Sequence, residues 1–288
     1  GYAPDREEIG RAIEMIAANM DNIASEQVYK DCFSMMDLTT LKTDDTPASV
    51  AKLVEKVNAF HKSYPEWPLP ASVCVFSNFA ATVKEVRKED FNITVVSACF
   101  PSSQSFLEVK LKEVEMAVEQ GADEVDIVLA LNAFLAGNYE VAAEEIRQVR
   151  RVIDEVAGKQ GRNVHLKVIL ETGLLKTPEN IANASFLAME AGADFIKTST
   201  GKVDVNATPL AAYVMCECIG IYRMATGKKI GFKPAGGISS AADALCYYSI
   251  VSSLLGKDWL NKELFRFGVS RVANSLLSAV EQKTVSYF

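Results

Sequence analysis

The chain has 288 residues, of which 49% are hydrophobic and 23% charged, proportions typical of a soluble globular protein with a large core. Its net charge of −7 argues against a basic surface for nucleic acid. Only two histidines, His61 and His165, occur, so few residues are available to form a histidine metal site or a Ser-His-Asp triad. We therefore expect chemistry that depends on lysine and carboxylate side chains.

In chain order, the sequence alternates short apolar runs with amphipathic segments. Residues 5–25 come first, where Ile9, Ile13 and Ile16 recur at helical spacing, and we interpret residues 1–30 as a helical extension that covers one end of the main body. The later runs with the character of strands are 32–38, 71–76, 93–98, 124–129, 164–171, 195–200, 229–233 and 264–268. The segments with helical character are 47–60, 79–89, 105–120, 139–157, 178–190, 208–225, 240–255 and 270–282.

Several of these helices begin at recognisable start signals. Thr46-Pro47 and Thr177-Pro178 each combine an N-cap residue with a proline for the first turn. Ser105 and Glu108 form the Ser-x-x-Glu pattern of a capping box, which predicts a helix start there.

Strict alternation of strands and helices predicts a parallel sheet, because right-handed crossovers join its strands. Eight units of about 36 residues match a closed barrel better than an open doubly wound sheet, which usually has five or six strands. No linker or change in composition divides residues 31–288. We therefore predict an α/β fold, a single (β/α)8 TIM barrel over residues 31–288 preceded by the helical extension.

The six cysteines and the N-terminal residues bear on the compartment. The cysteines form no C-x-x-C pair and lie in apolar segments, as expected for reduced thiols. The N-terminus has no apolar stretch of the signal-peptide type, and no run reaches the ~18 apolar residues of a membrane span. We expect a cytoplasmic protein without contact to a membrane.

A repeated motif relates two charged residues. Residues 119–126 and 190–197 share E-x-G-A-D, and the alignment places Asp126 and Lys197 at equivalent positions two units apart. Alternate strands of such a barrel contribute to the same interior layer, so this carboxylate and this amine should lie at one level of the core. The alternative is a shared turn motif with incidental charges.

Three lysines fall within predicted strands. Lys197 interrupts the apolar run after Asp194, Lys233 ends the next strand, and Lys167 lies in the preceding one. A second ammonium ~5 Å away at an effective dielectric of ~20 would lower a lysine pKa by more than two units, from ~10.4. With desolvation, this would make Lys197 a nucleophile for carbonyl groups. In isolation, Lys197 could equally be a strand-end lysine whose ammonium reaches solvent.

Two glycine-rich segments, 233–239 and 266–271, follow the last two predicted strands. Loops at these places in barrels often bind phosphate through backbone N–H groups and a helix N-terminus. Gly201 and Lys202 would form a third side of this phosphate site. The alternative is that these glycines only serve tight turns.

Several motifs resemble those of the deoxyribose-phosphate aldolase family, over about residues 35–282. They are Met36–Leu41, Glu124–Asp126, Lys167–Thr172, Asp194–Lys202, Val205–Thr208 and Gly231–Gly237. The resemblance implies a class I aldolase that uses neither a metal nor another cofactor, on a (β/α)8 barrel. It further implies cleavage of 2-deoxy-D-ribose 5-phosphate to D-glyceraldehyde 3-phosphate and acetaldehyde.

The resemblance also implies roles for individual residues. Lys197 matches the lysine that forms the Schiff base, Lys233 the lysine that lowers its pKa, and Asp126 the acid–base carboxylate that works through an ordered water. The residues implied to bind substrate, along the pocket and at the phosphate site, are Asp37, Cys74, Lys167, Thr200, Gly201, Lys202, Gly236, Gly237, Gly268 and Ser270. The implied partner is a small phosphosugar, not nucleic acid or a membrane, and the implied assembly is a homodimer or homotetramer.

The chain departs from the family pattern at several positions. Ser239 stands where arginine is common, Arg271 stands where a small polar residue is usual, and Tyr287 is followed by Phe288 although some members end in a tyrosine that reaches the active site. These departures motivate an alternative, a diverged barrel with weak or no turnover that binds a phosphosugar or a protein. A further alternative is another Schiff-base barrel enzyme, such as a transaldolase.

Overall fold

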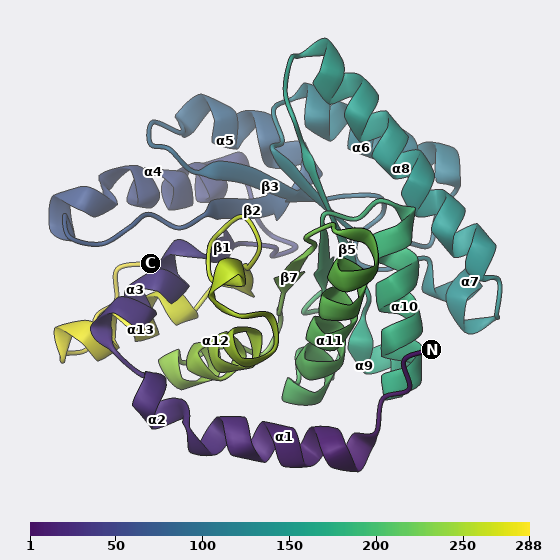
Figure 1. The fold of residues 1–288 in the computed structure, drawn as a ribbon. Helices are drawn as coiled ribbons and strands as arrows, with labels where there is room; N and C mark the ends of the chain where they lie inside the picture. The colour runs from purple at the N-terminus through teal and green to yellow at the C-terminus, as the bar shows by residue number, and fades with distance from the viewer.

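The centre of the structure, a computed structural model that describes residues 1–288, is a parallel sheet of eight strands curled into a barrel (Figure 1). The strands are β1 Met36–Thr39, β2 Ser72–Phe76, β3 Asn92–Val96, β4 Glu124–Val128, β5 His165–Ile169, β6 Phe195–Lys197, β7 Gly231–Lys233 and β8 Phe267–Val269. They are hydrogen-bonded in the order β7-β6-β5-β4-β3-β2-β1-β8. Two isolated parallel bridges, Phe232 to Phe265 and Ala235 to Gly268, join the chain at β7 to the chain at β8. The predicted (β/α)8 barrel is confirmed.

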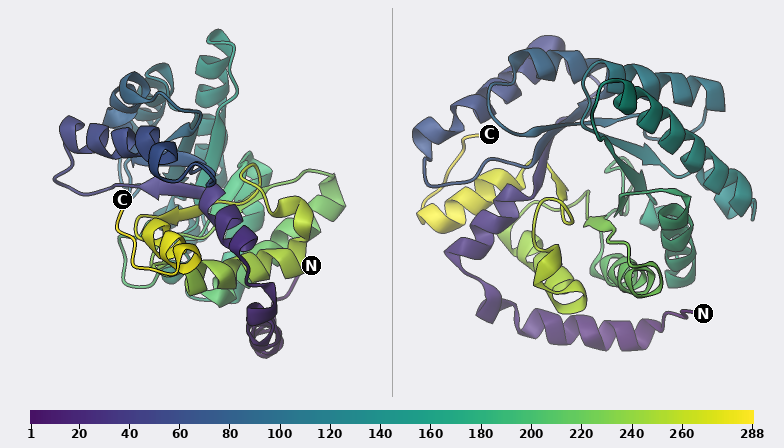
Figure 2. Two further views of the ribbon diagram at one scale, coloured as in Figure 1. Left: turned by 90° about the vertical axis from the view of Figure 1, so that its left-hand side faces the viewer. Right: turned by 45° about the horizontal axis from the view of Figure 1, so that its top comes forward.

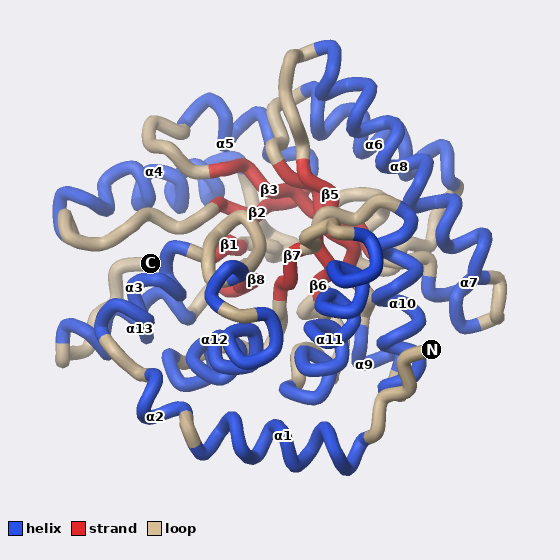
Figure 3. Tube along the Cα trace, in the orientation of Figure 1, coloured by secondary structure: helices blue, strands red, loops and turns tan.

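Helices surround the barrel on its outside (Figure 3). The main helices that follow the eight strands in turn are α4 Pro47–Ser63, α5 Ala80–Val86, α6 Leu107–Glu119, α8 Tyr139–Lys159, α10 Pro178–Ala191, α11 Pro209–Thr226, α12 Ala241–Leu255 and α13 Val272–Glu281. Short helices α7 Leu131–Leu135 and α9 Thr172–Leu175 lie in the loops after β4 and β5, and 3-10 turns lie at Ser77–Phe79 and Lys257–Trp259. None of the helices combines the length and the apolar character that crossing a membrane requires.

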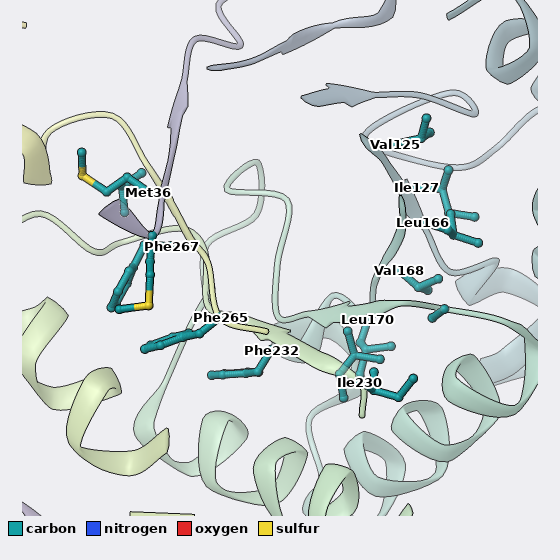
Figure 4. Close-up of a cluster of buried hydrophobic side chains, with 14 of the residues drawn as sticks. Met36, Val125, Ile127, Leu166, Val168, Leu170, Ile230, Phe232, Phe265 and Phe267 are labelled. Atoms are coloured by element: carbon teal, nitrogen blue, oxygen red, sulfur yellow. The ribbon is translucent and has the colours of Figure 1, made fainter. Parts of the chain in front are cut away.

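Apolar and charged residues alternate along the strands, so the two faces of the sheet differ. Val125 and Ile127 point outward into the buried layer between sheet and helices, as do Leu166 and Val168 (Figure 4). Since neighbouring residues of a strand point to opposite faces, the residue between each pair points into the barrel. The barrel interior is therefore polar, while the main apolar core lies between strands and helices.

The N-terminal extension consists of α1 Arg6–Ala18, α2 Met20–Ile23 and α3 Glu26–Ser34. Helix α1 lies across the outside of α11 and α12 (Figure 2), and Ile9 is its buried anchor. The extension is helical, as expected, but it covers the side of the barrel at α11 and α12 and not one end of it. The domain boundary after residue 30 stays a prediction, and it falls within α3.

Two local predictions were wrong. Residues 32–34 belong to α3 and not to the first strand, because Ser25 caps this helix by accepting a hydrogen bond from the Val28 amide. A short apolar run such as this one fits a buried helix as well as a strand. The capping box at Ser105 does not form, since α6 begins at Leu107 and its N-cap Phe106 makes no side-chain bond. The caps at Thr46 and Thr177 are confirmed.

Candidate active site

Seven charged side chains fill the barrel interior, and none is more than 3% exposed. They come from β1, β4, β5, β6, β7 and the residue just before β8. They are Asp37, Glu124, Asp126, Lys167, Lys197, Lys233 and Arg266. We refer to these residues as the charged network.

The carboxylate of Asp126 lies at the centre of the charged network. Its Oδ2 atom is 3.2 Å from Nζ of Lys197 and 2.8 Å from Nζ of Lys233, and its Oδ1 atom is 2.9 Å from Nζ of Lys167. Asp126 and Lys197 therefore lie together in the barrel interior, as the repeated motif predicted. Because two ammonium groups contact the same oxygen, Lys197 and Lys233 are direct neighbours.

The lysines differ in how their charge is compensated. Burial, and then the neighbouring ammonium of Lys233, lowers the pKa of Lys197. Burial alone would also lower the pKa of Lys233 and of Lys167, but nearby carboxylates overcome it and raise both. Asp126 shows the converse, since burial would raise its pKa and the surrounding lysines hold it below the ordinary value. Lys197 is thus the amine of the network most readily neutral.

A cavity of about 510 Å³ opens above the charged network at the carboxyl ends of the strands, and Lys197 alone of the seven reaches its wall. Most residues predicted to bind substrate also line it, namely Thr200, Gly201, Lys202, Gly236, Gly237, Gly268 and Ser270. Asp37, Cys74 and Lys167 do not, because they are fully buried below it. The position is the usual one for active sites in barrels of this kind.

The loops after β7 and β8 present free hydrogen-bond donors to this cavity. The amides of Gly236, Gly237 and Ile238 donate to no acceptor within the protein, and neither do those of Ser270 and Arg271. Helix α13 begins at Val272 without a side-chain cap, so its positive end also faces this region. Free amides and an open helix N-terminus together form a site for an anion.

The loop after β6 differs from these two, because its amides are already bonded. Thr200 donates to Glu171 at 3.1 Å, Gly201 to Asn206 at 3.0 Å, and Lys202 to the hydroxyl of Thr200 at 3.0 Å. This loop contributes the ammonium of Lys202, whose Nζ donates to the carbonyl oxygen of Leu41 at 2.6 Å. In this loop, an anion can therefore bind the side chain of Lys202 but not the backbone amides.

Two glycines are required by close contacts. A Cβ at Gly268 would lie 2.7 Å from Cβ of Ala235 and 3.0 Å from Cε of Lys233, so this glycine makes room for the lysine. Gly236 has φ +81°, and a Cβ there would lie 2.6 Å from Cβ of Asn206. The glycines thus shape the lysine pocket as well as the turns.

Two members of the charged network, Glu124 and Arg266, were not predicted from the sequence. Arg266 was assigned to a phosphate-binding turn, but it points into the barrel and contacts Asp37 and Glu124. Both missed residues stand two positions before a residue identified as part of the site, Glu124 before Asp126 and Arg266 before Gly268. The period of two in strands could have placed Glu124 on the inner face.

The positions that depart from the family pattern lie in two regions. Ser239 and Arg271 both line the cavity, so an arginine is present in the same cavity that lacks one at residue 239. Tyr287 lies away from it: its hydroxyl donates to the carbonyl oxygen of Lys56 at 2.7 Å, and its ring packs edge-on against Phe60. The structure therefore places the tail tyrosine on α4 and not over Lys197.

No group of three or more histidine, cysteine, aspartate or glutamate side chains is arranged to hold a metal ion. The carboxylates inside the barrel all face lysine or arginine.

Comparison with known proteins gives consistent matches. A family model described as DeoC/LacD family aldolase matches residues 32–246. The deoxyribose-phosphate aldolase of Homo sapiens is 42% identical over 261 residues, which cover 87% of this chain and 78% of that protein. The solved structure of "QR15, an Aldolase" matches with a TM-score of 0.66 and 26% identity, over 88% of this chain and 95% of that one. The tetrameric deoxyribose phosphate aldolase from Aeropyrum pernix shares the fold, with a TM-score of 0.68 and 21% identity over 96% and 98% of the two chains.

Proposed function

The chain belongs to the DeoC/LacD family of aldolases, and from this premise we propose that it cleaves 2-deoxy-D-ribose 5-phosphate to D-glyceraldehyde 3-phosphate and acetaldehyde. The human relative bears the name deoxyribose-phosphate aldolase. The observation that carries the proposal is that a single lysine of a buried charged network opens onto a cavity with unpaired backbone amides. None of the relatives compared above supports a non-catalytic binding module or a transaldolase.

Lys197 is the proposed nucleophile. Its neutral Nζ attacks the C1 carbonyl carbon of the open-chain sugar, and loss of water from the carbinolamine leaves a protonated Schiff base. Three observations support this role: the lysine reaches the cavity, its pKa is lowered, and Asp126 contacts it at 3.2 Å. Lys233 supplies the neighbouring positive charge.

The carbon–carbon bond then breaks between C2 and C3. The C3 hydroxyl gives up its proton, the C2–C3 electron pair flows toward the iminium nitrogen, and D-glyceraldehyde 3-phosphate leaves. The remaining enamine takes a proton at C2, and hydrolysis releases acetaldehyde and the free amine. Asp126 is the proposed acid–base group, and because it lies below the cavity wall we propose that it acts through a water molecule.

The substrate phosphate occupies the other end of the cavity. The unpaired amides of Gly236, Gly237 and Ser270 would bind its oxygens, and the side chains of Lys202 and Arg271 would balance its charge. Asp37, Cys74 and Lys167 would act from below, by holding the charged network in place. Competition by inorganic phosphate checks this placement, since Arg271→Ser should weaken it and Ser239→Arg should strengthen it.

Covalent trapping tests the central step. Incubation with acetaldehyde and borohydride should add one ethyl group to the intact protein, and peptide mapping should find it on Lys197. The variant Lys197→Ala should gain nothing, and Lys110→Met, which removes a buried lysine outside the barrel interior, should still be labelled. An unlabelled parent protein, or a label on another lysine, would contradict the proposal.

The remaining features of the proposal concern assembly and conditions. We propose a cytoplasmic homodimer or homotetramer that acts without a metal ion. The Aeropyrum pernix relative is described as a tetramer, and all six cysteines here are free thiols. Light scattering on the purified protein measures the assembly, and turnover after dialysis against a chelator measures the metal requirement.

A further inference from the structure

Two members of the charged network lie below the reacting amine and touch neither the cavity nor Lys197. Nη1 of Arg266 is 2.7 Å from Oδ1 of Asp37 and 2.8 Å from Oε1 of Glu124. The same carboxylate of Glu124 is 2.7 Å from Nζ of Lys167. Arg266 and Glu124 therefore form the lower part of a continuous chain of ion pairs that ends at Lys197.

In this series of ion pairs, the number of basic groups differs from the number of carboxylates. Four basic groups face three carboxylates: Lys167, Lys197, Lys233 and Arg266 face Asp37, Glu124 and Asp126. With every basic group protonated, the network would carry one excess positive charge in a fully buried region. Unbalanced charge in such a place is costly, so the network is balanced when one amine is neutral.

The contacts indicate which amine gives up its proton. Lys167 contacts three carboxylates, while Lys233 and Arg266 each contact two. Lys197 contacts only Asp126, at 3.2 Å. Because Lys197 contacts the fewest carboxylates, it is the amine that loses its proton most readily.

The floor of the barrel below this arrangement is aromatic. The ring of Phe195 lies 5.9 Å from Nζ of Lys167 and 5.8 Å from Cζ of Arg266, and its centroid is 6.4 Å from that of the His165 ring. Gly231 makes room for the Phe195 ring, since a Cβ there would lie 2.4 Å from it. Because these charged groups are buried away from water, each charge of the network acts strongly on the others.

Arg266 is a costly residue for stability alone. Its Nη2 atom is buried and has no hydrogen-bond partner. A buried donor left unpaired destabilises a fold, and such exceptions concentrate at functional sites.

We propose that Arg266 and Glu124 are positioning residues that set the charge balance of the barrel interior and thereby decide that Lys197 is neutral and nucleophilic. They act through Asp37 and Lys167 and do not touch the substrate. This inference rests on the proposed role of Lys197.

The two residues have opposite charges, so their removal has opposite effects. Arg266→Met removes a positive charge and raises the pKa of Lys197, whereas Glu124→Gln removes a negative charge and lowers it. The other groups that face the lysine or the lower pair stay in place, namely Asp37 on β1, Cys74 on β2, Asp126 on β4, His165 and Lys167 on β5, and Lys233 on β7. The double variant loses one charge of each sign and keeps the balance.

The experiment is the pH dependence of reductive trapping with acetaldehyde, measured by mass on the intact protein. The midpoint should move to higher pH in Arg266→Met and to lower pH in Glu124→Gln, each by about one unit, which is tenfold in rate at a fixed pH below the midpoint. The double variant should return close to the parent, and Arg266→Lys, which keeps the charge, should stay there too.

The outcomes separate this inference from the proposed function. A parent protein without any adduct on Lys197 removes the proposed function. A labelled parent whose variants slow down without opposite shifts of the midpoint overturns only the charge-balance inference and leaves a structural role. If circular dichroism finds Arg266→Met unfolded, Glu124→Gln and the double variant decide by the same criterion.

Discussion

Replacing Lys233 by methionine should reduce turnover at neutral pH by at least about a hundredfold, and the loss should be recovered at alkaline pH. The ammonium groups of Lys233 and Lys197 contact the same oxygen of Asp126, at 2.8 and 3.2 Å. At a separation of ~5 Å and an effective dielectric of ~20, their repulsion amounts to about 3 kcal/mol, which is more than two pKa units. Without Lys233, the amine of Lys197 becomes the only ammonium in contact with Oδ2 of Asp126, so it holds its proton more strongly.

The assay for this variant is kcat/KM for 2-deoxy-D-ribose 5-phosphate as a function of pH. The midpoint of the acid limb should rise by about two units, and the alkaline plateau should approach that of the parent. Lys110→Met is the matched control, because Lys110 is also buried and pairs with Glu145 at 2.9 Å, outside the barrel interior. The control should lose stability and keep its midpoint. A uniform loss at every pH in Lys233→Met, with the midpoint unmoved, would refute the electrostatic role.

Three further predictions concern the cavity, the tail and the stability of the network. Lys202→Met should raise KM for the phosphorylated sugar by about tenfold and leave 2-deoxyribose, which has no phosphate, unaffected; steady-state kinetics with both sugars measures the difference. Tyr287→Phe should leave kcat within about twofold, since its hydroxyl bonds the carbonyl oxygen of Lys56 and not the cavity; a loss of about tenfold or more in the same assay would contradict that placement. Burial would raise the pKa of Asp37 and Asp126, but the nearby lysines dominate and hold both below the ordinary value. Their stabilising contribution is therefore fully present above the ordinary carboxyl range, begins to fall as the pH enters that range, and is lost completely only below the lowered native pKa. Urea unfolding from about pH 6 to about pH 3 should therefore find falling stability, less steep in Asp126→Asn.

The barrel was predictable because eight strand-like runs alternate strictly with helical segments along the chain. On β4, Val125 and Ile127 had to face an apolar layer, so Asp126 had to face the opposite side. The same reasoning places Lys167 on the inner face, because Leu166 and Val168 on either side of it point outward (Figure 4). The repeated motif predicted that Asp126 and Lys197 share a level of the barrel interior, and the lysines were recognised because they fall within predicted strands; the period of two would have added the inner face of β4.

The first strand was less predictable, because the sequence there has no clear period. Residues 32–36 are apolar apart from Ser34, and the first part of this run continues a helix that begins after Ser25. The cap at Ser25 starts this helix, and Phe33 within it packs against Phe60 and Trp67. The prediction failed because a short apolar run fits a buried helix as well as a strand.

The partners of each charged group could not be read from the sequence. Arg266 stands beside a glycine-rich turn, and that neighbourhood suggested phosphate, although its side chain lies with Asp37 and Glu124 across the barrel. The distance along the chain between these partners exceeds two hundred residues in the case of Asp37. Only closure of the sheet between β8 and β1 brings them together.

Glycine content was also an incomplete guide to anion binding. Gly201 and Gly236 both have positive φ and both line the cavity. The amide of Gly201 is taken by Asn206, while the amide of Gly236 remains free. Because the side chain of Asn206 accepts the Gly201 amide, that amide cannot bind a ligand, whereas the Gly236 amide can. A glycine permits the turn, but the acceptors around it decide whether its amide can bind a ligand.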